Sequence, residues 1–170
     1  MTETGFELAS FARKGELIEA RLTALIDDHL ERVWAALTEP GELVQWLAPG
    51  AIELRPGGAV KLDFADSGIV IDSQVTAVKP LHLLEYSWSG PSEPVRPVRW
   101  ELEPVGPMVR LTLTLGVPAS EDVARSCAGW AAHLEMLVAA LAGIPIKFPF
   151  EVFKAARETY KSRLAAEQLV

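Results

Sequence analysis

The longest helical pattern in the chain runs from Ala119 to Gly143. Ser120 is the predicted N-cap of this helix, and Gly143 followed by Pro145 predicts its end. Apolar residues recur in it at spacings of three and four, which places them on one stripe of an α-helix: Val123, Cys127, Trp130, Leu134, Leu137 and Leu141. Since a sheet needs an apolar element to cover its face, we expect this helix to lie across the strands that precede it.

Alternating apolar and polar residues predict seven strands before the long helix. The first covers residues 16–26, and its apolar face holds Ile18, Ala20, Leu22, Ala24 and Ile26. The others are predicted at residues 52–54, 60–65, 69–78, 84–88, 98–102 and 109–115. Turn signals such as Pro56-Gly57-Gly58 separate successive strands, and short turns predict antiparallel neighbours.

Two short helices are predicted between the first strand and the second. Asp27 or Asp28 is the expected cap of the first helix, which carries Trp34 as a core residue. Pro40 suits the first turn of the second helix. The order is therefore strand, two short helices, about six strands and one long helix. This order predicts an α+β fold, in which a curved antiparallel sheet is covered by one helix.

The two ends of the chain are predicted to differ from this main unit, which covers residues 16–143. Residues 1–15 are weakly patterned and are expected to form a loose arm with one helical turn around Phe6 to Phe11. Residues 144–170 are an expected extension, because Pro145 and Pro149 prevent a regular helix before Phe150.

Phe150 to Leu164 then has an amphipathic helical pattern. Its apolar face is expected to cover the core, the mouth of a cavity or another subunit. A homodimer through the surface around Phe153 and Tyr160 is one expectation for this helix.

Composition narrows the functional class. A chain of 170 residues with 49% hydrophobic residues predicts one domain with a full core. A net charge of −7 opposes nucleic-acid binding, which favours a basic surface. We also see no signal peptide and no apolar run long enough for membrane insertion. A single cysteine, Cys127, excludes an internal disulfide, so the expected location is the cytoplasm.

Three segments resemble a known family. They are ERVWAALTEP at residues 31–40, continued by LVQWL at 43–47, then LEYSW at 84–88 and GWAAHLEML at 129–137. In this order they are similar to the domain homologous to the activator of Hsp90 ATPase, over residues 16–143. The resemblance implies the helix-grip fold of the START and Bet v 1-like (SRPBCC) superfamily. Its members typically enclose an apolar cavity between sheet and long helix and bind lipids, polyketides, hormones or other hydrophobic molecules.

The resemblance also implies two other roles. Some relatives are cyclases, which makes a cyclase or hydrolase an alternative. An Hsp90-type chaperone partner, with a role in stress response, is implied only distantly. The eukaryotic cochaperones carry an additional N-terminal domain for which this chain has no room, and the last 27 residues extend beyond the plain domain.

The expected site is a cavity for a hydrophobic small molecule such as a lipid, polyketide or aromatic metabolite. Its expected lining residues are Leu43, Trp46, Phe64, Tyr86, Trp88, Trp100, Trp130, His133 and Leu137. Large rings with one polar N–H suit such a cavity, although they would equally suit a filled core. No nucleophile, phosphate or metal motif is present, so we expect no cofactor and no metal.

Three hypotheses remain open at the level of the sequence. In a binding protein, His133 at the edge of the apolar stripe would hydrogen-bond the ligand. In an enzyme it would act as a general base, with Tyr86 as a hydrogen-bond donor. An interaction module would show a filled core and an exposed apolar patch instead. Cys127, on the apolar stripe, is predicted to be a buried structural thiol.

Overall fold

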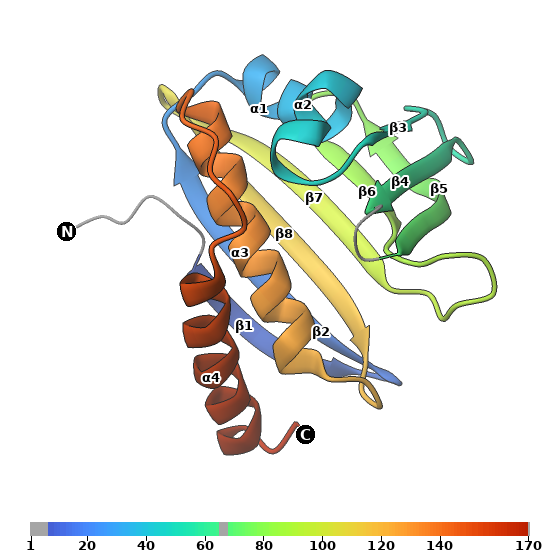
Figure 1. The fold of residues 1–170 in the computed structure, drawn as a ribbon, viewed down its shortest axis with the longest axis vertical. Helices are drawn as coiled ribbons and strands as arrows, with labels where there is room; N and C mark the ends of the chain where they lie inside the picture. Colours follow the sequence, from blue (N-terminus) through green and yellow to red (C-terminus); the bar gives the residue numbers. More distant parts are fainter. Residues whose placement is uncertain (1–6, 65–67, 170) are drawn as a thin grey trace.

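One antiparallel sheet organises the molecule. The computed structural model describes residues 7–64 and 68–169. Within these residues eight strands lie side by side in the order β1-β2-β8-β7-β6-β5-β4-β3 (Figure 1). Their bounds are β1 (Glu7–Lys14), β2 (Leu17–Ile26), β3 (Gly50–Ile52), β4 (Ala59–Phe64), β5 (Ile69–Lys79), β6 (Leu83–Ser87), β7 (Pro97–Val105) and β8 (Met108–Pro118).

Strand β1 corrects the prediction for the beginning of the chain. Glu7–Lys14 is extended and pairs with β2, so the loose arm with a helical turn is wrong over these residues, while Phe6 lies outside the described ones. Gly15, with φ 62°, makes the tight reversal between the two strands. Phe11 is buried against Tyr160 of the C-terminal helix, with ring centroids 6.0 Å apart. A partner from the far end of the chain thus stabilises a weakly patterned strand.

Four helices cover one side of the sheet. They are α1 (Leu30–Thr38), α2 (Pro40–Trp46), α3 (Val123–Leu141) and α4 (Phe150–Ala166). Figure 1 shows α3 lying across the sheet, α4 beside it next to β1, and the two short helices near the end of α3. The predicted helix-grip arrangement is confirmed. No helix among the described residues is both long and apolar enough to span a membrane.

The helix starts differ from those expected. The side chain of Asp122, not Ser120, caps α3 by accepting a hydrogen bond from the backbone N–H of Arg125 at 3.1 Å. The N-cap of α1 is His29, which makes no side-chain cap. Asp28 instead accepts a hydrogen bond from the His29 backbone N–H, at 2.7 Å. The predicted start of α2 at Pro40 is confirmed.

The apolar stripe of α3 is the centre of the core. All six of its predicted residues are buried: Val123, Cys127, Trp130, Leu134, Leu137 and Leu141. They face inward-pointing residues of the central strands, such as Leu22 on β2, Leu113 on β8 and Trp100 on β7, all at 0% exposure. Burial raises the pKa of the Cys127 thiol to about 12, and the prediction of a buried structural thiol is confirmed.

Helix α4 belongs to the same core. Tyr160 and Leu164 are buried, and Phe153 and Ala156 pack against the core with part of their surface. The guanidinium of Arg163 lies over the Phe11 ring, 5.6 Å from its centroid. Tyr160 is therefore unavailable for the homodimer interface expected around it, because its ring is already packed inside its own chain.

We expect Leu164→Ala to lower the free energy of unfolding by about 2–5 kcal/mol, because it opens a cavity under a side chain that is fully buried. Glu158→Ala, on the exposed side of the same helix, is the control and should change it by less than about 0.5 kcal/mol. Chemical denaturation measures both. An unchanged stability in Leu164→Ala would show that α4 does not pack on its own chain in solution.

Candidate functional site

The nine residues expected to line a cavity come from separate parts of the fold. Helix α2 supplies Leu43 and Trp46, and α3 supplies Trp130, His133 and Leu137. Phe64 ends β4, Tyr86 lies on β6, Trp88 follows it, and Trp100 lies on β7. The fold therefore brings together residues that are far apart in the chain, such as His133 and Trp46, whose backbone oxygen contacts the His133 ring across 87 positions.

Most of these residues are part of the closely packed core. Six of the nine are at most 7% exposed: Leu43, Trp46, Tyr86, Trp100, Trp130 and Leu137. The other three, Phe64, Trp88 and His133, are half-buried and mark the edge of the group. Two surface depressions, of about 600 and 550 Å³, include none of the nine. The first lies on the outer face of the sheet, with Arg21, Glu101 and Thr112 among its lining residues.

The rings form a connected series from the interior to the surface. Trp46 and Trp100 meet at 5.9 Å between ring centroids, Trp100 and Trp130 at 5.8 Å, and Trp130 and Trp88 at 4.7 Å. Phe64 lies 5.7 Å from Trp88. These pairs have interplanar angles of 68–90°, the edge-to-face geometry that aromatic quadrupoles favour.

His133 occupies the outer part of this series. Its ring centroid is 5.9 Å from that of Phe64 and 6.4 Å from that of Trp130. Its Nδ1 lies 3.0 Å from the backbone oxygen of Trp46. Because a carbonyl oxygen only accepts, Nδ1 carries the proton and donates this bond. The bond fixes the imidazole against the end of α2.

The same surroundings keep His133 neutral. Burial lowers its pKa, and the hydrogen bond to Trp46 offsets only part of this effect. In the neutral ring with the proton on Nδ1, Nε2 has a free lone pair. His133 therefore presents a hydrogen-bond acceptor, or a weak base, among aromatic rings.

A second polar group lies deeper in the cluster. The Trp100 indole N–H is buried and has no hydrogen-bond acceptor among the described residues at suitable geometry. It is close enough to Tyr86 to offset part of the effect of burial, which raises the pKa of that phenol to about 12. A buried donor without a partner costs about 1–3 kcal/mol of stability. The Trp100 N–H is therefore an unsatisfied donor in an otherwise apolar core, available to an acceptor that reaches it.

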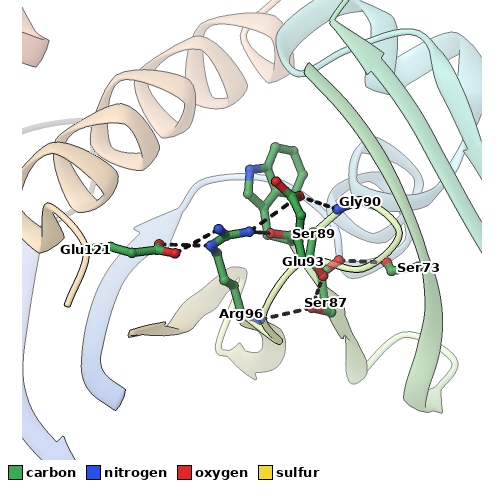
Figure 2. Close-up of polar contacts among 8 residues, drawn as sticks. Ser73, Ser87, Ser89, Gly90, Glu93, Arg96 and Glu121 are labelled. Atoms are coloured by element: carbon green, nitrogen blue, oxygen red, sulfur yellow. Dashed lines mark hydrogen bonds and ion pairs between the residues drawn. The ribbon is translucent and has the colours of Figure 1, made fainter. Parts of the chain in front are cut away.

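A polar network holds the segment that carries Trp88 (Figure 2). Ser73 Oγ donates to the backbone oxygen of Ser87 at 2.6 Å, and the Ser87 and Ser89 hydroxyls are 2.6 Å apart. Ser87 Oγ also accepts from the backbone N–H of Arg96 at 3.0 Å. Ser73 on β5 is half-buried and its hydroxyl has a hydrogen-bond partner, while the neighbouring Gln74 is exposed.

Arg96 joins this network to the turn before α3. Its Nε and Nη2 donate to the two carboxylate oxygens of Glu121 at 2.9 and 2.8 Å, and its Nη1 donates to the backbone oxygen of Trp88 at 3.3 Å. The guanidinium lowers the pKa of Glu121 below its usual value. A two-bond pair of this kind fixes direction as well as distance, so it ties the loop after Trp88 to the start of α3.

One member of the aromatic series was not predicted from the sequence. Phe148, from the segment between α3 and α4, lies with its ring centroid 5.4 Å from that of His133, and it contacts Phe150 at 5.0 Å and Phe153 at 5.9 Å. Its position between Pro145 and Pro149 predicted only an irregular segment. We call Phe64, Trp88, Trp130, His133 and Phe148 the aromatic site.

Among the described residues, the aromatic site matches neither a three-ligand metal centre nor a hydrogen-bonded pair of His133 and Tyr86. No group of three or more His, Cys, Asp or Glu side chains able to hold a metal ion occurs among the described residues. Tyr86 and His133, the pair expected to cooperate in an enzyme, make no hydrogen bond to each other. His133 bonds to Trp46 instead, and Tyr86 is 1% exposed.

Comparison with protein-family models gives a match over residues 29–142, to the Activator of Hsp90 ATPase homolog 1-like protein family. The chain belongs to this family. The matched region contains every member of the aromatic site except Phe148. A search of curated proteins finds no significant sequence match.

Solved structures share the fold across most of the chain. CalU16 from Micromonospora echinospora matches with a TM-score of 0.78 and 20% identity, over 92% of this chain and 96% of that one. A protein encoded by gene BPP1335 from Bordetella parapertussis matches with a TM-score of 0.72 and 28% identity, over 96% of both chains. DynU16 matches with a TM-score of 0.67 and 27% identity, over 75% of this chain and 48% of that one.

The neutral state of His133 predicts a pH effect. Its pKa is lower in the folded chain than the ordinary value of 6.5, so the unfolded chain binds the proton more readily, and stability falls as pH decreases below about 6.5. We expect His133→Gln to reduce the fall in unfolding free energy between about pH 7.5 and about pH 5.5. Denaturation at the two pH values measures it, with His29→Gln at an exposed position as control. An identical fall in His133→Gln and wild type would contradict a lowered pKa.

The Arg96–Glu121 pair predicts the mobility of the Trp88 segment. Arg96→Lys keeps the charge but loses the two-bond geometry, so we expect about 1 kcal/mol less stability and faster amide hydrogen exchange over residues 88–96. Arg110→Lys is the matched control, because Arg110 makes one exposed contact with Glu103 at 3.2 Å. Equal exchange in the two variants would refute the positioning role of Arg96.

Proposed function

We propose that this protein binds a small hydrophobic molecule, preferably an aromatic one, at the aromatic site. One observation carries the proposal: the neutral imidazole of His133 is held by Trp46 at 3.0 Å and is enclosed by rings at 5.4–6.4 Å. Ligand sites are typically apolar surfaces with a few fixed polar groups, and this arrangement has that composition.

The edge of the cluster is the part suited to a ligand. Phe64, Trp88 and His133 retain surface, whereas Trp46 and Trp100 are fully buried and interlocked. A flat molecule could stack on the half-buried rings after small side-chain movements, while the deeper tryptophans would serve as a rigid floor. The deeper residues of the expected cavity are therefore better regarded as support for the site.

The polar groups suggest what such a ligand carries. His133 Nε2 is a hydrogen-bond acceptor, so it favours a hydroxyl or N–H on the ligand. The unpartnered Trp100 N–H favours an acceptor such as a carbonyl, if the ligand reaches it. A hydroxylated aromatic ring is the smallest molecule that meets the first requirement and matches the stacking surface.

The relatives support a small-molecule role without naming a ligand. DynU16, with 27% identity, is described as a protein of the dynemicin biosynthetic locus. The chain covers less than half of DynU16, so only a general connection with small-molecule chemistry is carried over. Binding is favoured over a cyclase or hydrolase reaction because His133 and Tyr86, the expected catalytic pair, are not hydrogen-bonded to each other.

A protein-interaction module is the second candidate. A closely packed core together with exposed apolar residues would favour it, and Ile144 and Phe150 are 69% and 64% exposed. A chaperone partner of the Hsp90 type belongs to this second candidate. The two candidates differ in whether the aromatic site accepts a small molecule.

We expect 1-naphthol to bind several-fold more tightly than 1-methylnaphthalene, which has the same rings without a hydroxyl donor. His133→Phe keeps an aromatic side chain but removes the acceptor, so it should abolish this preference without abolishing binding. Ligand-detected NMR titration measures both affinities. His82→Phe, distant from the aromatic site and next to the depression on the outer face, is the control.

Two results together would overturn the proposed function. One is no binding of either probe up to its solubility. The other is native mass spectrometry of the purified protein that shows no small molecule released by organic extraction. The interaction-module hypothesis would then be the better explanation of the exposed apolar residues.

A further inference from the structure

The segment between α3 and α4, residues 143–149, lies along α3 and ends at the aromatic site (Figure 1). We call it the strap. Both of its attachments are firmly held. Leu141 at the end of α3 is buried, and its backbone oxygen accepts a hydrogen bond from Arg32 at 3.1 Å. On the other side, α4 is fixed by buried Tyr160 and Leu164.

The backbone of the strap is loosely attached. Its first two N–H groups, those of Gly143 and Ile144, bond to Ala140 and Ala139 and only complete the end of α3. From residue 145 to 148, none of the described residues outside the strap and α4 forms a hydrogen bond with its backbone. Pro145 lacks the N–H donor altogether. Hydrogen bonding therefore does not hold the strap against the body of the protein.

One side chain provides the attachment instead. Phe148 is half-buried and packs on His133 at 5.4 Å, whereas Ile144 and Ile146 are 69% and 40% exposed. The two exposed isoleucines bury little apolar surface in this position of the strap, so they contribute little to its stability. Contact between Phe148 and its aromatic neighbours is thus the main interaction that favours this position.

We propose that the strap is a lid over the aromatic site, with Phe148 as the plug that covers His133. Withdrawal of Phe148 uncovers the outer side of the imidazole, while α3 and α4 keep their places because their own buried side chains hold them. The proposal concerns residues beyond 142, where the family match ends, and it rests on the proposed function for its biological meaning.

The energetics allow such an opening. Hydrophobic stabilisation grows with the apolar area removed from water, so the half-buried ring of Phe148 contributes less than a fully buried phenylalanine. Opening at residues 145–148 breaks no backbone hydrogen bond to the described residues outside the strap and α4. Minor conformations separated by such small differences in free energy are generally populated on the order of 0.1–10%. A ligand that stacks on the uncovered rings would replace the Phe148 contacts and shift this population toward the open form.

The test measures access to His133 directly. Diethyl pyrocarbonate acylates an unprotonated imidazole nitrogen, and peptide mass spectrometry follows the reaction at His133. We expect Phe148→Ala to react several-fold faster than wild type and Phe148→Leu to react at an intermediate rate. Ile144→Ala, which removes an exposed side chain from the same strap, should react at the wild-type rate. Thermal melting confirms that each variant is folded.

Equal rates for Phe148→Ala, Ile144→Ala and wild type would overturn the lid. The association rate of 1-naphthol with wild type and with Phe148→Ala, measured by stopped flow, separates this proposal from the proposed function. Faster acylation of His133 in Phe148→Ala, without naphthol binding to either protein, would support the lid and count against the proposed function. Naphthol binding at the same rate in both proteins, together with equal acylation, would count against the lid alone.

Discussion

Burial of the apolar stripe of α3 against the sheet is the interaction on which the rest of the structure depends. The stripe supplies Trp130, which touches both Trp88 and Trp100, so it joins the loop after β6 to the central strands. A close-packed interior transmits any displacement of such a ring to its neighbours. The position of α3 therefore sets the position of the aromatic site.

The aromatic site lies where this packing ends. His133 is next to the stripe on α3, and it is bonded to the end of α2 through the Trp46 backbone oxygen. Trp46 in turn donates its indole N–H to the Ala36 oxygen of α1 at 2.7 Å. Two short helices and the long one thus orient a single imidazole, and burial keeps it neutral so that it can accept a hydrogen bond.

Two segments control the surroundings of that imidazole by different means. The loop after Trp88 is fixed by charged and hydroxyl groups, with Arg96 and Glu121 as its firm attachment. The strap is held mainly by the Phe148 ring. A directional ion pair gives a fixed wall, and a single aromatic contact gives a movable one. This difference is consistent with a binding site that is open to exchange on one side.

The sequence by itself determined the main elements of the fold. The stripe on α3 and the alternation in β2 follow from the periods of helix and strand, and local patterns are enough to predict both. It also predicted Trp88, Trp130 and His133 as members of one group. It failed for β1, which is stabilised by pairing with β2 and by the contact of Phe11 with Tyr160.

Only the tertiary structure decided which aromatic residues fill the core and which form the edge of a site. Trp46 and Trp88 were both expected to line the cavity, but Trp46 is buried against Trp100 of β7, whereas Trp88 is half-buried beside a loop. It alone placed Phe148 on His133, two residues joined by neither strand nor helix periodicity. Such contacts depend on how separate elements pack, and local periodicity carries no information about that packing.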